Sequence, residues 1–376
     1  DQSFLLNGVT QPNIPFLLDN NYEEVAAANR YLSHVALYTE SRSSKTWIRY
    51  AEGLKEYFAF VEQNCEDWKQ QWSSSLALLA AWRKFMLDNG RKTSYINQQI
   101  GIVNRFFNWC IKQEIINKNP LDKISRSING LERLQSGLLM HTQKIGVNRT
   151  KTELKLREYE EPIKFIHMSD VPNFINAIPT KRDKLVSLLM VDAGMRRMEA
   201  LHLNRACFQK IEPYSSSAMK LTLDAKITPT KGNKSRWVLV SKELVYEINR
   251  YMAETNDERP EKNEKDYEPL FKSKRGTLIT LNYLNTVFTA ASERSGIKCH
   301  PHMMRHTYGT YELKSRKDSG ESEGTALLWV KQRMGHSSIS TTERYLHLTQ
   351  ECGGGTLEKY KVYVNELMQR EFNGEN

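Results

Sequence analysis

Apolar side chains recur at spacings of three and four along most of this chain, the pattern of amphipathic helices. In the first 120 residues the pattern is clear over 47–61, 76–87 and 96–111, and it is weaker over 25–35. Ser94 precedes the third of these segments and is a candidate N-cap. Because no alternating strand pattern interrupts them, we predict a small helical domain at the N-terminal end.

The next segment, 125–160, is polar, basic and weakly periodic. Structureless loops of that length are uncommon inside a compact domain, so we interpret it as a linker or an insertion. A second domain then begins near Ser169, a candidate N-cap for another apolar helix.

In one part of this second domain the apolar residues recur at every second position instead of every third or fourth. Residues 220–227 alternate between apolar and polar side chains, and 236–240 follow after the turn formed by 231–234. This pattern predicts a β-hairpin, with helices again from there to Tyr345. The predicted fold is therefore mainly α with a small β-hairpin or sheet (α+β). The predicted domains are 1–124, a linker 125–164, a domain 165–350 and a C-terminal tail helix 351–376 that follows three glycines.

Composition narrows the class of protein. Apolar residues make up 39% of the 376 residues, enough to bury a core in each domain. The longest apolar run, Leu76 to Trp82, is too short to cross a bilayer. The five cysteines form no CxxC pair, which argues against structural zinc and a disulfide framework. No secretory signal heads the chain, so we expect a soluble cytoplasmic protein without membrane contact, nucleoid-associated if bacterial.

Charge points to a polyanionic partner. The formal net charge is +10, and residues 91–150 hold ten lysines and arginines against three acidic residues, whereas residues 1–90 are net negative. A local basic stretch is what a phosphate-facing surface requires. We expect DNA contacts from residues on or beside the third helix, although a solvated basic face explains each of them equally well. These residues are Arg91, Lys92, Arg105 and Lys112.

Two basic segments could form an anion site. In 194–201 a glycine ends one helix and places Arg196 at the start of the next, with Glu199 three residues later. In 229–236 a Gly-Asn turn carries Lys231, which such a tip could direct into a groove. Taken alone, each segment is more often simply solvated.

Two later segments add histidines and a tyrosine. His302 and Arg305 share a helix face and pair a proton carrier with a fixed cation. The spacing of histidines and carboxylates in metal-binding helices is missing around them, so we predict no metal. Gly335-His336 and a Ser/Thr run precede Tyr345, nine residues after His336.

The order of these four segments resembles that of the tyrosine recombinase (phage integrase) family. The strongest matches are 302–307, then 335–342, then Tyr345; the turn 231–236 resembles the hairpin of Xer-type members. The resemblance covers about 165–350 and implies a helical, SAM-like core-binding domain before the catalytic domain. It implies Tyr345 as the nucleophile that forms a 3′-phosphotyrosyl link to DNA.

The resemblance also assigns roles to the other residues. Arg196 and Arg305 would clamp the phosphate, His302 would be the base and Lys231 the general acid. The catalytic set is Arg196, Lys231, His302, Arg305, His336 and Tyr345; Glu199 and His306 are supporting residues, with packing favoured for His306; Lys234 and Arg236 are further DNA-contact candidates.

The expected partners follow from the same family. They are a double-stranded recombination site, a homotetramer on that DNA that passes through a four-way junction, and accessory recombination factors; without DNA the protein would be a monomer or weak oligomer. No cofactor, metal or ATP is expected. The tail helix would dock on the next protomer, with docking back onto its own domain as the alternative. Integration, transposition and dimer resolution all remain open.

Two alternative functions and two departures from the family pattern remain. A type IB topoisomerase uses similar residues, and a non-catalytic DNA-binding regulator could share the fold. The polar run 314–324 and the segment 214–217 exceed the usual family spacing, and we interpret both as loop growth.

Overall fold

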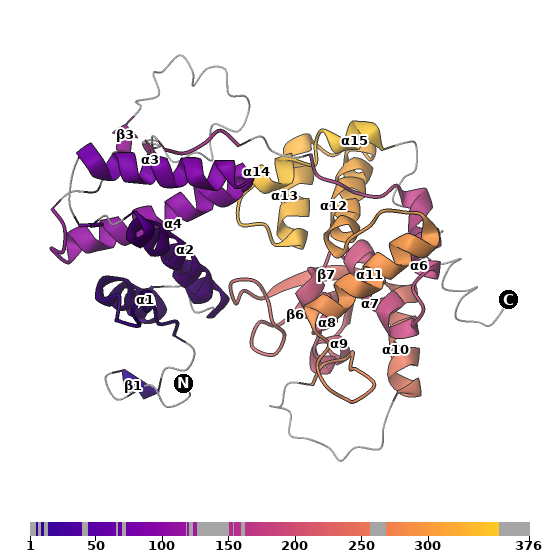
Figure 1. Ribbon diagram of the computed structural model, residues 1–376. Helices are drawn as coiled ribbons and strands as arrows, with labels where there is room; N and C mark the ends of the chain where they lie inside the picture. Colours follow the sequence, from indigo (N-terminus) through magenta and orange to yellow (C-terminus); the bar gives the residue numbers. More distant parts are fainter. Residues whose placement is uncertain are drawn as a thin grey trace. The chain divides into compact units, whose positions relative to one another are not determined.

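The computed structural model describes residues 5–6, 9–10, 14–39, 44–64, 67–69, 73–117, 119, 123–125, 150–152, 154–158, 162–255 and 268–352 (Figure 1). The chain divides into two compact units, Asp1–Glu160 and Glu161–Asn376. None of the described helices has an apolar stretch long enough to cross a membrane. The predicted tail helix lies outside the described residues, apart from its first two positions.

The first unit is a helical bundle around an aromatic core. Tyr57, Trp82, Phe106 and Phe107 are fully buried at its centre. Helix α2 approaches α4 closely at Gly53, where a Cβ atom would lie 2.4 Å from the side-chain oxygen of Gln99 and 2.9 Å from Ile102. Its helices are α1 (Ala26–Tyr38), α2 (Ser44–Gln63), α3 (Ser73–Asp88) and α4 (Thr93–Lys112), and the two-residue strands β1 (Leu5–Leu6) and β2 (Val9–Thr10) pair with each other.

The predicted linker is partly attached to this first unit. Strands β3 (Lys123–Ser125) and β4 (Thr150–Thr152) pair antiparallel, and Leu154 is buried in the core of the bundle. The side chain of Asn97 on α4 both donates to the carbonyl of Leu156 and accepts from its N–H, each at 2.8 Å. These hydrogen bonds fix the returning chain on α4.

The second unit surrounds a helix that is buried on all sides. Residues 185–191 of α7 have no exposed surface, as expected of a helix whose apolar residues are not confined to one stripe. Helices α12 and α10 and strand β7 pack on it. Its helical elements are η2 (Met168–Asp170), α6 (Val171–Asn176), α7 (Lys181–Asp192), α8 (Arg197–Leu201), α9 (Arg205–Gln209), α10 (Lys242–Glu254), α11 (Leu281–Ser295), α12 (Pro301–Asp318), α13 (Glu323–Met334), α14 (Ser340–Glu343) and α15 (Leu348–Glu351).

A small antiparallel sheet of order β5-β6-β7 completes this unit (Figure 1). Its strands are β5 (Glu212–Pro213), β6 (Ala218–Leu223) and β7 (Arg236–Ser241), with Leu221 opposite Val238. The mainly helical fold with a small hairpin or sheet is confirmed.

Of the two segments interpreted as loop growth, 214–217 is a loop, whereas 314–324 is largely helical. The backbone N–H groups of Tyr214 and Ser215 donate to the carbonyl of Ala218, so this segment is the turn between β5 and β6. Residues 314–318 of the polar run extend α12 to Asp318, and its last two residues begin α13. Ion pairs from Arg316 to Glu312 and Glu321, at 2.9 and 2.6 Å, stabilise that last turn.

Three boundary predictions were also wrong. Ser94 lies inside α4, because the helix already begins at Thr93. Ser169 lies within a short 3-10 helix that leads into α6, and neither of these helices has a side-chain cap. The first hairpin strand ends at Leu223, because Asp224 begins a turn in which its carbonyl accepts from Ile227 and Thr228.

Candidate active site

The site begins where α7 ends and α8 starts. Gly194 has φ of +62° and a Cβ atom there would lie 2.3 Å from the ring of Tyr308, so glycine is required on both counts. Arg196 is the N-cap of α8, and Glu199 accepts a hydrogen bond from its backbone N–H at 2.8 Å. The guanidinium of Arg196 also pairs with Glu199 at 2.8 Å. These two contacts with Glu199 orient Arg196 within the site.

Glu199 is the buried anion of the site, with no exposed surface. Burial by itself would raise the pKa of Glu199, but Arg236 and Arg196 outweigh burial and hold that pKa below its ordinary value. The carboxylate is therefore charged at neutral pH. Glu199 therefore contributes one negative charge next to the three positive charges of Arg196, Arg236 and Arg305.

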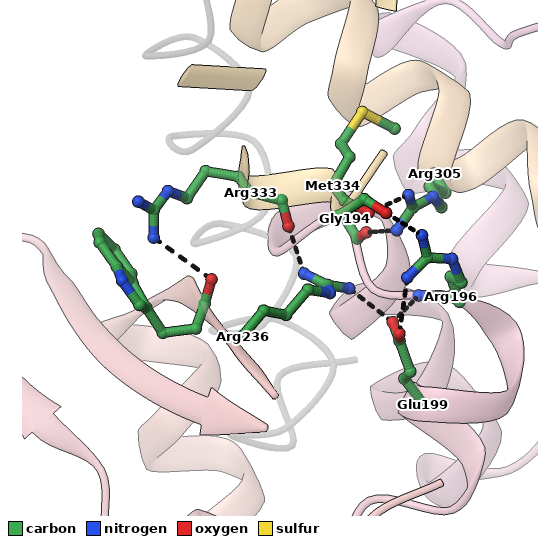
Figure 2. Close-up of polar contacts among 9 residues, drawn as sticks. Gly194, Arg196, Glu199, Arg236, Arg305, Arg333 and Met334 are labelled. Carbon is green, nitrogen blue, oxygen red and sulfur yellow. Dashed lines mark hydrogen bonds and ion pairs between the residues drawn. The ribbon is translucent and has the colours of Figure 1, made fainter. Parts of the chain in front are cut away.

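Those three arginines converge on the last turn of α13 (Figure 2). The guanidiniums of Arg236, Arg305 and Arg196 donate to the carbonyls of residues 333, 334 and 335 respectively. The final carbonyls of a helix lack partners within the helix and carry the negative end of its dipole, so they suit cationic donors. Gly335 ends the helix in the left-handed conformation, with φ of +63°.

Arg305 is the most deeply buried of the three. It donates to the carbonyl of Gly194 at 2.5 Å as well as to Met334. Burial, and then repulsion from Arg196 and Arg236, lowers the pKa of Arg305 to about 9, so the side chain remains charged at neutral pH. Three guanidiniums and one carboxylate leave two positive charges that an oxyanion could neutralise.

Tyr345 lies in the same site and is almost fully buried, with 1% of its surface exposed. Its hydroxyl is hydrogen bonded to Nδ1 of His306 at 2.8 Å. Burial raises the pKa of Tyr345 to about 12, even though Arg305 and Arg344 lower it. Burial and the charges of neighbouring groups lower the pKa of His306 to about 3. A neutral imidazole and a neutral phenol therefore share this hydrogen bond.

His336 covers the other side of this tyrosine. Its ring is parallel to that of Tyr345 within 7°, at 6.1 Å between centroids, and its Nδ1 is 3.0 Å from the hydroxyl of Thr342. Burial and the positive charge of Arg305 lower the pKa of His336 to about 3. Gly309 leaves room for the phenol, because a Cβ atom there would lie 2.7 Å from Met334 and 3.1 Å from Tyr345.

His302 is exposed, and the ring of His306 lies between it and Tyr345. It stacks on His306 at 6.1 Å, and partial desolvation of its ring by the neighbouring groups, followed by the charge of Arg305, lowers the pKa of His302. His302, the expected base, is thus separated from Tyr345 by the ring of His306. His306, which we expected to pack, makes the hydrogen bond to the Tyr345 hydroxyl. The sequence held a signal for this, since residues four apart on a helix share a face.

The hairpin lysines lie apart from these contacts. Lys231 and Lys234 are exposed in the turn between β6 and β7, where Gly232 and Asn233 have φ of +75° and +52°. No hydrogen bond or ion pair joins Lys231 to the arginines in the part of the chain that the structure describes. Arg236, expected to contact DNA, instead has a side chain that is 10% exposed and paired with Glu199.

The four candidate DNA contacts of the first unit lie on or beside α4. Arg91 lies over the ring of Tyr95 at 5.3 Å, and Arg105 over Tyr50 at 5.7 Å. Among the described residues, no group of three or more histidines, cysteines or carboxylates is arranged to hold a metal ion.

Known proteins are similar to this chain over most of its length. Transposase A from transposon Tn554 of Staphylococcus aureus is 24% identical over 359 residues, which cover 92% of this chain and 93% of the transposase. Tyrosine recombinase XerA of Pyrococcus horikoshii is 26% identical over 246 residues, 64% of this chain and 77% of that protein.

Solved structures share the fold. XerH recombinase bound to palindromic difH substrate, in a post-cleavage complex, gives a TM-score of 0.58 at 17% identity and covers 89% of each chain. The Tn1549 transposon integrase in complex with circular intermediate DNA gives a TM-score of 0.55 at 16% identity, and the match covers 90% of this chain and 98% of the integrase. The phage integrase family matches residues 164–351. Because this match spans half of the chain and includes the arginine cluster and Tyr345, the protein belongs to the phage integrase family.

Proposed function

We propose that this protein is a site-specific DNA recombinase that cuts and rejoins strands through a covalent link between Tyr345 and a 3′-phosphate. The observation that carries the proposal is the pair Arg196 and Arg305 at the end of α13, directly before His336, whose ring stacks on the buried Tyr345. Family membership supports it, as do the relatives named as a transposase and as tyrosine recombinases.

The proposed reaction uses the positive surplus of the cluster. The oxygen of Tyr345 attacks the phosphorus, the bond to the 5′-oxygen breaks, and negative charge grows on the non-bridging oxygens, where Arg196 and Arg305 stabilise it. The leaving 5′-oxygen takes a proton, and we assign its donation to Lys231 on the exposed hairpin. His336 donates a further hydrogen bond to the phosphate.

Tyr345 needs to leave its buried position before it can attack. A phenol with 1% of its surface exposed does not reach a duplex phosphate, and its raised pKa opposes loss of the proton. We therefore assign the described structure to a resting state in which His306 holds the hydroxyl. In the active state His302, the exposed ring on the same helix, is the proposed base for the tyrosine proton.

Rejoining follows from the same chemistry. The phosphotyrosyl link conserves the energy of the phosphodiester bond, so the proposed reaction uses no ATP or metal ion. A 5′-hydroxyl of a second duplex attacks the link and releases Tyr345. Exchange of both strand pairs requires four protomers and a four-way junction, and we propose a tetramer on the recombination site, with the basic first unit binding the same DNA.

A nicked duplex that traps the covalent intermediate tests the first step. Wild-type protein should form an adduct that resists denaturation, and Tyr345→Phe should form none. Tyr311→Phe is the matched control, because Tyr311 is also buried in this unit but binds the backbone N–H of Met168 at 3.1 Å. No adduct with wild-type protein would favour a non-catalytic regulator.

Two marked duplexes separate recombination from simple relaxation. A recombinase joins strands between the duplexes, whereas a type IB topoisomerase relaxes supercoils within one. Relaxation without joined products would refute the recombinase assignment and leave Tyr345 as nucleophile.

A further inference from the structure

Arg236 occupies a central position that the proposed mechanism does not use. It is the first residue of β7, and its two terminal nitrogens bind different elements (Figure 2). Nη2 pairs with Oε2 of Glu199 on α8 at 2.5 Å, and Nη1 donates to the carbonyl of Arg333 on α13. One side chain thus joins the sheet, the start of α8 and the end of α13.

Arg236 shares the buried carboxylate of Glu199 with Arg196. Oε1 binds the guanidinium of Arg196 at 2.8 Å, whereas Oε2 accepts from the backbone N–H of Arg196 and from Arg236. Without the Arg236 side chain, Oε2 would keep only the backbone donor in a fully buried position. The carboxylate would then turn toward the remaining guanidinium and change its orientation.

That orientation matters for the phosphate. A guanidinium recognises an oxyanion through paired, coplanar N–H groups, so a small rotation removes a contact. The carbonyl of Gly335 holds the other end of the Arg196 guanidinium, and Arg236 binds the carbonyl at 333, two residues earlier at the same helix end. Arg236 therefore contacts Glu199 directly and also binds the helix end that holds the other side of Arg196.

We propose that Arg236 is a positioning residue for strand cleavage, which acts through Glu199 and the last turn of α13 to fix Arg196. The inference rests on the function proposed above. A direct contact with DNA is the alternative role, which the kinetic test below separates from positioning. In the described structure the side chain is 10% exposed, and both terminal nitrogens bind groups within the protein.

Arg236→Lys is the decisive substitution. It keeps the charge, but an ammonium group on a single stem does not bridge the carboxylate and the carbonyl as a planar fork does. Arg182→Lys is a matched control, because Arg182 also pairs with a fully buried carboxylate, Asp183 at 2.9 Å, and its side chain is 13% exposed. Arg182 makes none of the contacts of the arginine cluster.

Adduct formation should be measured in single turnovers on the nicked duplex, with increasing protein concentration. For Arg236→Lys we expect a rate at saturation reduced by ~10²-fold, the typical cost of misplacing a reacting group. The concentration that gives half saturation should stay unchanged. Arg182→Lys should keep the wild-type rate. Arg236→Ala leaves a space shaped for a guanidinium, so ethylguanidinium ions should restore part of its rate and ammonium ions should not.

Two results would overturn the proposal. If the rate at saturation is unchanged but a higher protein concentration is needed for half saturation, Arg236 is a DNA contact. If both parameters equal those of the wild type, Arg236 is dispensable. Failure of the wild-type protein to form any adduct is a separate result, which refutes the proposed function and this inference with it.

Discussion

At the scale of single residues, the site depends on a glycine that no catalytic step requires. Gly335 combines a left-handed backbone with close contacts: a Cβ atom there would lie 2.8 Å from Cδ of Arg236 and 3.3 Å from a guanidinium nitrogen of Arg196. A side chain at this position would therefore move the arginines that bind the end of α13.

Gly335→Ala should lower both stability and the rate of adduct formation. The left-handed backbone costs roughly 1–2 kcal/mol for a residue with a Cβ atom, and the displaced arginines add to that. Gly296→Ala is the control, because Gly296 also ends a helix with φ of +73° but has no atom within 4 Å of its Cβ position. Urea unfolding and single-turnover kinetics would test this. Equal losses in the two variants would show that the contact with Arg236 has no effect.

The buried histidines make stability depend on pH. The pKa of His306 and that of His336 are each lowered to about 3, whereas unfolding restores an ordinary pKa of ~6.5. As pH falls below ~6.5, the unfolded chain therefore binds protons that the folded protein does not, and the free energy of unfolding decreases. Glu199, whose pKa is also lowered, loses its contribution at still lower pH.

Replacing both histidines by glutamine should flatten this pH dependence between pH 6.5 and 4.5. Glutamine retains hydrogen-bonding groups but does not titrate. His347→Gln is the control, because His347 is exposed and should leave the slope unchanged. Urea unfolding at a series of pH values measures the slope directly. A slope that is the same in the double variant and the wild type would contradict the assignment of neutral, buried imidazoles.

At the scale of elements, a stack of aromatic rings and guanidiniums holds α13 in place. The guanidinium of Arg333 lies over Trp237 of β7 at 2.9 Å and over Trp329 at 4.6 Å, and that of Arg316 lies over Trp329 at 3.8 Å. The indole of Trp329 also donates to Glu312 at 3.0 Å. The stack thus connects the extension of α12 to the sheet, and the helix whose last carbonyls bind the arginines lies between them.

Trp329→Leu should lower the free energy of unfolding by about 2 kcal/mol, because the leucine makes neither the cation–π interactions nor the hydrogen bond of the indole. Leu328→Ala is the control, since the neighbouring Leu328 is 48% exposed and contributes little. Denaturant titration followed by circular dichroism would measure both. A decrease no larger than that of the control would mean that the stack does not stabilise α13.

Sequence reasoning reached the helices, the hairpin and the motif residues because each has a short-range signal. The apolar spacing of α4 and the alternation in β6 are local, and each motif between Arg196 and Tyr345 is recognised from a few consecutive residues. The roles of Arg236 and His306 depend on contacts across the fold, to Glu199 and Tyr345, at separations of 37 and 39 residues. The extension of α12 was misinterpreted because its partner Trp329 lies in the following helix.

At the scale of the whole molecule, the excess charge of residues 91–150 remains a prediction of DNA binding. Lys92→Gln and Lys112→Gln, at the two ends of α4, should each weaken binding at low salt, with little dependence on sequence. Removing one lysine–phosphate interaction should reduce the slope of log affinity against log salt by ~0.9. Lys55→Gln on α2 is the control, because Lys55 is exposed in the part of the first unit with net negative charge. An unchanged salt slope in both α4 variants would assign those lysines to a solvated surface.

The identity of the residue bound to DNA tests the proposed chemistry most directly. Wild-type protein trapped on a nicked duplex would be digested with nuclease and protease, and the modified peptide sequenced by tandem mass spectrometry. We predict a single nucleotide, linked through its 3′-phosphate to the hydroxyl of Tyr345. A link to any other residue, or a 5′-phosphate in the link, would contradict the proposed mechanism.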